Sequence, residues 1–136
     1  MTTIVVGVDG SPNSRHAVEW AVAHAADRDA RVVAVHAVGL LEHERGDPGA
    51  AHLAPQLDEW TQALDELGAD RVERRLVAGE PVAVLLEVSD DCGADLVVVG
   101  TRGAGARGVG VLGSTSLQLA ERCRCPLVIV PNETGR

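Results

Sequence analysis

Ile4-Val-Val-Gly-Val8 is an almost continuous apolar run, and Asp9-Gly-Ser11 separates it from a segment with helical periodicity, Pro12–Asp27. Ser11 can cap the first turn of that segment, and proline suits the first helical position. A second apolar run follows at Val32–Val38. Runs of this kind are typical of parallel strands that are covered on both faces. The first forty residues therefore predict a strand, a helix and a second strand.

The same alternation continues to the end of the chain. Strands are predicted at Arg71–Val77, Leu96–Val99 and Leu127–Val130, the first of them at a sheet edge because it is the most polar. Helices are predicted at Pro55–Leu67, from about Pro81 to Cys92, and from near Ser114 to before Pro126. This order predicts an α/β fold: an open parallel five-stranded sheet with helices on both faces and right-handed crossovers. A length of 136 residues without repeat or linker predicts one domain, 1–136.

The composition excludes several classes of protein. All 12 basic residues are arginine, so a P-loop lysine and a Schiff-base lysine are impossible. The aromatic residues are Trp20 and Trp60, which we interpret as packing residues, so stacking platforms for single-stranded nucleic acid are almost absent. A net charge of −8 argues against nucleic-acid or anionic membrane partners. No apolar run is long enough to span a membrane, and we expect a cytoplasmic protein.

Two groups of residues could bind metal but lack the spacing for it. The cysteines Cys92, Cys123 and Cys125 suit a reducing compartment, and Cys123-x-Cys125 lacks the partners of a zinc site, so we interpret them as buried or half-buried thiols. The irregular segment Gly39–Ala54 is predicted to be a solvated loop, and no metal site is predicted there. Its possible ligands are Glu42, His43, Glu44, Asp47 and His52.

The segment from Gly100 to Ser116 carries six glycines in its first fourteen residues, between a predicted strand and a predicted helix. So many glycines are costly in backbone entropy, and they make sense where backbone N–H groups must approach phosphate oxygens closely. The helix start adds free N–H groups and the positive end of its dipole. Hydroxyl groups and positive charge are available from Ser114, Thr115, Ser116, Arg102 and Arg107. This segment predicts a phosphate site.

Asp9 follows the first predicted strand and could accept hydrogen bonds from ribose hydroxyls, help to hold a divalent ion, or simply cap the next helix. Gly103-x-Gly105-x-x-Gly108 matches the dinucleotide fingerprint literally, and so does the pattern that begins at Gly108. The glycine run is far longer than the tight turn that this fingerprint requires, and only one strand follows it. We therefore discount an NAD-dependent oxidoreductase.

A different spacing is more specific: Gly100-x2-Gly103-x9-Gly113-Ser114. It resembles the ATP signature of the universal stress protein family, in its nucleotide-binding branch. The resemblance runs over essentially the whole chain, from Ile4-Val-Val-Gly-Val-Asp9-Gly-Ser11 to Cys125-Pro-Leu-Val-Ile-Val-Pro131. It implies the strand order 3-2-1-4-5, which brings the Asp9 and Gly100 loops together at the switch point of the sheet.

The resemblance also implies roles for individual residues. Asp9 would contact the adenosine part of the ligand, and Val38 would border the adenine. His36, which lies close by, is expected to be a core histidine with a satisfied ring rather than a nucleotide contact. The remaining positions would lie along the ribose and phosphates: Gly100, Arg102, Gly103, Gly113, Ser114 and Thr115. The ligand implied is ATP, with Mg²⁺ or Mn²⁺.

The leading hypothesis is a small ATP-binding protein with a regulatory role in stress response. A slow ATPase, and a sensor of cyclic nucleotides or other adenylates, remain alternatives. Hydrolysis is expected to be slow or absent, because the chain has no lysine and no clear general base beside the phosphates. The strand Leu127–Val130 carries no charge, so in the implied order it is an undefended edge, and we expect it to pair two copies in a homodimer.

Overall fold

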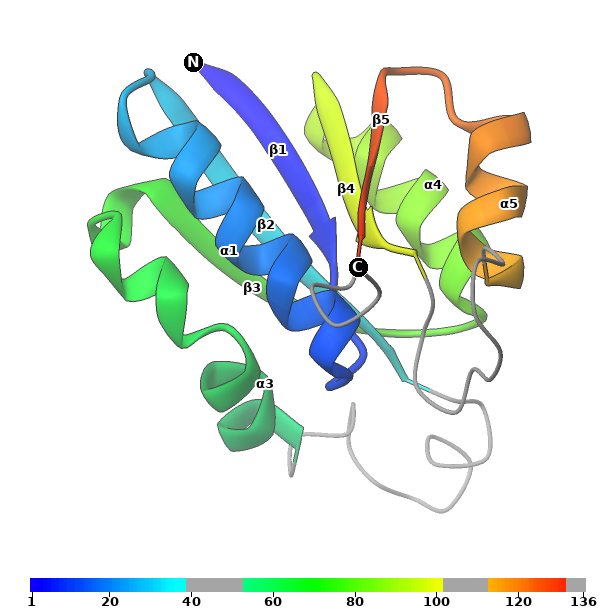
Figure 1. Ribbon diagram of the computed structural model, residues 1–136, viewed down its shortest axis with the longest axis horizontal. Helices are drawn as coiled ribbons and strands as arrows, with labels where there is room; N and C mark the ends of the chain where they lie inside the picture. Colours follow the sequence, from blue (N-terminus) through cyan, green and yellow to red (C-terminus); the bar gives the residue numbers. More distant parts are fainter. Residues whose placement is uncertain (39–52, 102–112, 132–136) are drawn as a thin grey trace.

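The computed structural model describes residues 1–38, 53–101 and 113–131, which form a parallel sheet covered by helices (Figure 1). The sheet has five strands in the order β3-β2-β1-β4-β5, so the order implied by the sequence resemblance is confirmed. Every neighbouring pair runs parallel. The strands are β1 Thr2–Gly7, β2 Ala30–Val38, β3 Val72–Ala78, β4 Leu96–Gly100 and β5 Leu127–Val130.

Four α-helices connect these strands within the described residues: α1 Pro12–Ala26, α3 Ala54–Trp60, α4 Pro81–Cys92 and α5 Ser114–Arg122. Their starts follow the local sequence. The Ser11 side chain accepts a hydrogen bond from the Ser14 N–H at the start of α1, as predicted. The α4 helix ends at Gly93, which adopts the left-handed conformation with φ 63° that glycine tolerates best. None of the described helices has the length and apolarity to cross a membrane.

The predicted single helix Pro55–Leu67 is wrong in its second half. The α-helix ends at Trp60, and Gln62–Glu66 and Ala69–Arg71 form short 3₁₀ helices. The break falls at the fully buried Thr61, whose Oγ1 donates to the Leu57 carbonyl at 2.7 Å. Arg74 on β3 donates to both Thr61 Oγ1 and the Thr61 carbonyl, at 2.7 and 3.1 Å. These hydrogen bonds to Thr61 interrupt the helix. The periodicity of apolar residues along the sequence does not reveal them, because Arg74 belongs to another element.

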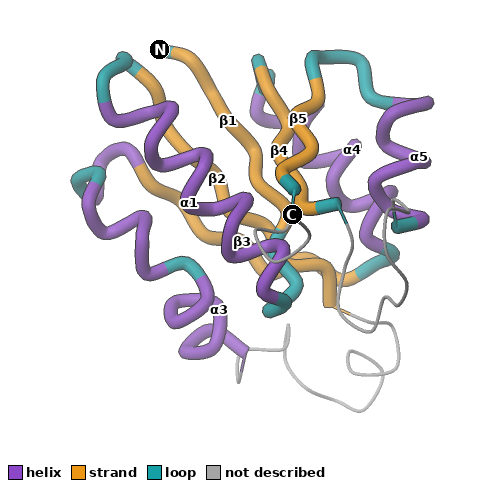
Figure 2. Tube along the Cα trace, viewed as in Figure 1, coloured by secondary structure: helices purple, strands orange, loops and turns teal. Residues whose placement is uncertain are grey.

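Two aliphatic cores lie between the helices and the sheet, one on each face of the sheet. One core packs α1, α3 and the following 3₁₀ segment against the sheet, and the other packs α4 and α5 against its opposite face (Figure 2). Alternate residues of the strands feed the two cores: Ile4 and Val6 belong to the first and Val5 to the second. Burial on both faces explains why β1, β2 and β4 read as continuous apolar runs.

Candidate functional site

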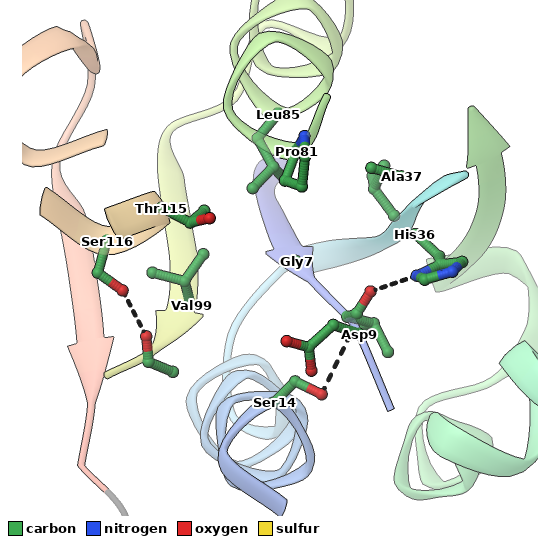
Figure 3. A pocket seen from close by; sticks show the side chains of 13 residues that line it. Gly7, Asp9, Ser14, His36, Ala37, Pro81, Leu85, Val99, Thr115 and Ser116 are labelled. Carbon is green, nitrogen blue, oxygen red and sulfur yellow. Dashed lines mark hydrogen bonds between the residues drawn. The ribbon is translucent and has the colours of Figure 1, made fainter. Parts of the chain in front are cut away.

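A pocket opens at the carboxyl ends of the strands, between β1 and β4, where the strand order reverses (Figure 3). Ligands of open α/β sheets bind at this position. Residues far apart in the sequence meet here, because β1 and β4 are neighbours in the sheet. The cavity has a volume of about 110 Å³, and its lining is Gly7, Val8, Asp9, Ser14, Val35, His36, Ala37, Pro81, Leu85, Val99, Gly100, Thr115 and Ser116.

Asp9 is held in the turn between β1 and α1. Its Oδ1 accepts the Ser11 N–H at 2.9 Å, and its own N–H donates to Ser14 Oγ at 3.3 Å. Helix capping itself is done by Ser11, whose Oγ accepts the Ser14 N–H at 3.2 Å. The Asp9 carboxylate points into the pocket, toward the α5 side (Figure 3). A carboxylate fixed in this way can accept hydrogen bonds from hydroxyl groups of a ligand.

His36 forms another part of the wall, at the end of β2. Its Nδ1 lies 2.8 Å from the Val8 carbonyl oxygen, so Nδ1 is the nitrogen that carries the proton in this contact. The ring also meets Trp60 edge-on, with the ring centroids 5.2 Å apart. The expected hydrogen-bonded ring is therefore confirmed at Nδ1, but His36 is half-buried rather than part of the core, and its ring lines the pocket. Trp60 packs against the first core, as predicted.

Gly10 and Gly100 are needed for close packing around the pocket. Gly10 has φ 81°, and a Cβ there would lie 2.7 Å from a carbon of the Trp60 ring. A Cβ on Gly100 would lie 2.8 Å from the backbone oxygen of Asn13, so the end of β4 rests directly on the first turn of α1. The family resemblance places Gly100 along the ribose and phosphates of the ligand. The structure adds a packing requirement between β4 and α1.

The start of α5 faces the pocket, and among the described residues no side chain caps it. Gly113 is the N-cap residue and supplies no side chain to bond the first N–H groups of the helix. Its position is fixed by its own N–H, which donates to the Thr101 carbonyl at 2.7 Å. Ser116, which is buried, donates from Oγ to the Gly100 carbonyl at 2.7 Å and ties the helix start to the end of β4. Uncapped N–H groups and the helix dipole favour an anion at such a position.

The residues proposed from the sequence fall into three groups. Asp9, Gly100 and Thr115 line the pocket, and Gly113 and Ser114 form the adjacent start of α5. Val38 instead lies buried against Leu53 and Leu76, and its neighbour Ala37 lines the pocket. The proposed phosphate contacts Arg102, Gly103 and Arg107 lie outside the described residues, as do the possible metal ligands between 42 and 52.

Sequence reasoning missed the apolar wall of the pocket. Pro81 and Leu85 come from the first two turns of α4, and Val99 from the end of β4 (Figure 3). The sequence predicts Pro81 only as the start of a helix. Its place after a strand put it at the correct edge of the sheet, but only the packing of α4 shows that it faces this pocket. The wall gives the site an apolar part beside the anion-binding part, which suits a ring joined to a phosphate.

Comparison with known proteins agrees with this architecture. The model of the universal stress protein family matches residues 1–131. A universal stress protein of Thermus aquaticus is 32% identical over 94% of this chain and 97% of that protein. Universal stress proteins of Mycobacterium bovis and Mycobacterium tuberculosis are 33% identical over 96% of this chain, which spans about half of their length, 48%.

A solved structure shares both sequence and fold. It is a universal stress protein in complex with cAMP, 34% identical to this chain, and the alignment covers 97% of this chain and 98% of that one with a TM-score of 0.76. The match to the family model extends from the first strand through the last. The chain belongs to the universal stress protein family.

Proposed function

We propose that this chain binds an adenine nucleotide in the pocket between β1, β4 and α5, and that it acts as a cytoplasmic regulator in stress response. The observation that carries the proposal is the uncapped start of α5 beside a pocket with an apolar wall and a fixed carboxylate. These are the parts that a base, a ribose and a phosphate chain require. The relative solved with cAMP supports the same class of ligand.

The proposed ligand is ATP with Mg²⁺ or Mn²⁺. The phosphates would rest on backbone N–H groups at Gly113, Ser114 and Thr115, with charge from Arg102 and with Gly103 allowing close approach. Asp9 would accept from the ribose hydroxyls, and the base would lie near the end of β2, against Ala37, which lines the pocket and precedes the buried Val38. Across the described residues no group of three or more metal-binding side chains is present, so the phosphates would supply most ligands to the ion.

A cyclic-nucleotide sensor is the second candidate, favoured by the structure that was solved with cAMP. Both candidates use the base and ribose parts of the pocket and differ in the number of phosphates at α5. Calorimetry with Mg²⁺-ATP, AMP and cAMP separates them. If ATP is the ligand, we expect it to bind at least about tenfold more tightly than AMP, an advantage of about 1.4 kcal/mol.

Tighter binding of cAMP than of ATP would assign the sensor instead. The mass of any nucleotide that purified protein releases on denaturation is an independent check, because it identifies the ligand carried from the cell. Tight NADH binding without ATP binding would contradict both candidates and restore the dinucleotide hypothesis. The direct comparison with AMP shows whether the additional phosphates are used at all.

We predict that ATP hydrolysis is slow, with a turnover below about 1 per second, the low end for ordinary enzymes. Efficient phosphoryl transfer needs a positioned nucleophile and a clamp of positive charge. The chain has no lysine, and His36 already directs Nδ1 to the Val8 carbonyl. Phosphate release under saturating Mg²⁺-ATP measures the rate, with Asp9→Asn as a control for contaminating activity. A faster turnover that Asp9→Asn abolishes would make the protein an ATPase.

We further propose a homodimer paired through β5. The two edges of the sheet differ sharply: β3 carries Glu73, Arg74 and Arg75, whereas β5 is entirely apolar. Both arginines of β3 form ion pairs within the chain: Arg74 with Asp65 at 3.1 Å and Arg75 with Asp91 at 3.0 Å. An apolar edge strand is a template for pairing with another chain, and a twofold axis beside β5 would pair it with its own copy.

A further inference from the structure

A second cavity lies at the C-terminal ends of α4 and α5, at the opposite end of these helices from the nucleotide pocket. Its volume is about 510 Å³. Two cysteines, Cys123 and Cys125, contribute to its wall, and so do the arginines beside them, Arg122 and Arg124. The cavity therefore combines a pair of thiols with two positive charges, at a place that the proposed nucleotide site does not use.

The two sulfur atoms are already in contact. Cys123 Sγ lies 3.9 Å from Cys125 Sγ, so that one thiol can donate its proton to the other sulfur. The segment between them is free of regular structure, because α5 ends at Arg122 and β5 begins at Leu127. A disulfide bond is about 2.05 Å long, so the sulfurs must approach by about 1.9 Å. Rotation of two side chains in a short connecting segment can supply that movement.

We propose that Cys123 and Cys125 form a reversible redox site, which an anionic low-molecular-weight disulfide of the glutathione type oxidises to an intrachain disulfide. The Cys123 thiolate attacks one sulfur of the small disulfide, forms a mixed disulfide and releases the first small thiolate, which takes up a proton. The Cys125 thiol then gives up its proton, and its sulfur attacks Cys123 Sγ and expels the second small thiol. Two electrons pass from the cysteine pair to the small disulfide.

The environment of Cys125 supports this order of events. Burial, together with the neighbouring Cys123 sulfur, raises the pKa of the Cys125 thiol to about 11. Cys125 therefore keeps its proton at neutral pH and acts second, after Cys123 has been converted to the mixed disulfide. The carboxylates near the cysteine pair are those of Asp90 and Asp95, and Arg122 and Arg124 carry the opposite charge. Both arginines line the cavity wall, where their guanidinium groups can pair with carboxylates of the small disulfide.

The test uses the full chain, equilibrated with mixtures of oxidised and reduced glutathione and then treated with an alkylating reagent. Trypsin cleaves after Arg124, between the two cysteines, so a disulfide is the only bond that holds the two resulting peptides together. We expect wild type to yield this linked pair, and Cys92→Ser, which removes the remaining thiol, to yield it equally. In Cys125→Ser, the glutathione adduct on Cys123 should accumulate at least about tenfold above wild type, because no second thiol resolves it.

Glutathione adducts in wild type without the linked peptides would overturn the proposal, and so would a disulfide that joins Cys92 or a second chain. An equal amount of adduct in wild type and Cys125→Ser would also overturn it, because Cys125 would then not resolve the mixed disulfide. Far-UV circular dichroism reports whether the variants fold. If a variant fails to fold, the peptide map of wild type alone still decides between an intrachain link and its absence.

Discussion

Gly113→Val is expected to weaken Mg²⁺-ATP binding at least about 100-fold, equivalent to about 2.7 kcal/mol, while the fold is retained. Gly113 stands at the N-cap of α5, where a branched side chain would occupy the space in front of the first helical N–H groups. Its φ of −69° and ψ of 161° are open to any residue, so valine introduces no backbone strain. Valine also keeps the N–H that donates to Thr101. Calorimetry measures the loss.

Two further variants show that the loss is local. Gly113→Asp places a carboxylate cap at the same position, which stabilises the helix start but repels phosphate. We expect Gly113→Asp to unfold at the same or a higher temperature than wild type and yet to lose ATP binding. Gln118→Val puts valine on the exposed side of the same helix and should leave binding unchanged. Unchanged affinity in Gly113→Val would remove the phosphate site from α5.

The parts of the fold that depend on the spacing of apolar residues along the chain, and on their burial, were predictable from the sequence. Continuous apolar runs such as Leu96–Val99 identify strands covered on both faces, and they fell within one or two residues of the observed strands. Local chemistry fixed helix ends, as at Ser11 and Gly93. The strand order came from the family resemblance, because periodicity does not tell which strands are neighbours.

Features that depend on contacts across the sheet were not predictable. The helix break at Thr61 requires Arg74, which lies on β3 and is thirteen positions away in sequence. The apolar wall of the pocket requires α4 to pack beside β1, and no local pattern in α4 distinguishes the residues that face the pocket from those that face the core. Val38 illustrates the same point, because its burial against Leu53 and Leu76 depends on how the end of β2 meets two other segments.

Ile129→Lys is expected to convert the proposed β5 dimer to a monomer, with the dimer dissociation constant raised at least about 100-fold. The carbonyls of Pro126 and Val130 accept hydrogen bonds from Val97 and Thr101. Backbone groups alternate in direction along a strand, so the N–H and C=O of Leu127 and Ile129 point to the outer edge of the sheet. They are available to an antiparallel copy, and a charged side chain at the centre of the pairing would be desolvated without a partner.

The control places the same charge at the other edge of the sheet. Ala69→Lys changes an exposed residue just before β3 and should leave the dimer intact. Val128→Lys tests the opposite face of β5, because Val128 packs against the α1 core and Ile129 against the α4 and α5 core. The variant with the larger effect shows which of these two faces the partner covers. If sedimentation equilibrium finds the wild type monomeric at micromolar concentration, the pairing is contradicted. The apolar, uncharged edge strand β5 would then remain exposed to water without a partner strand.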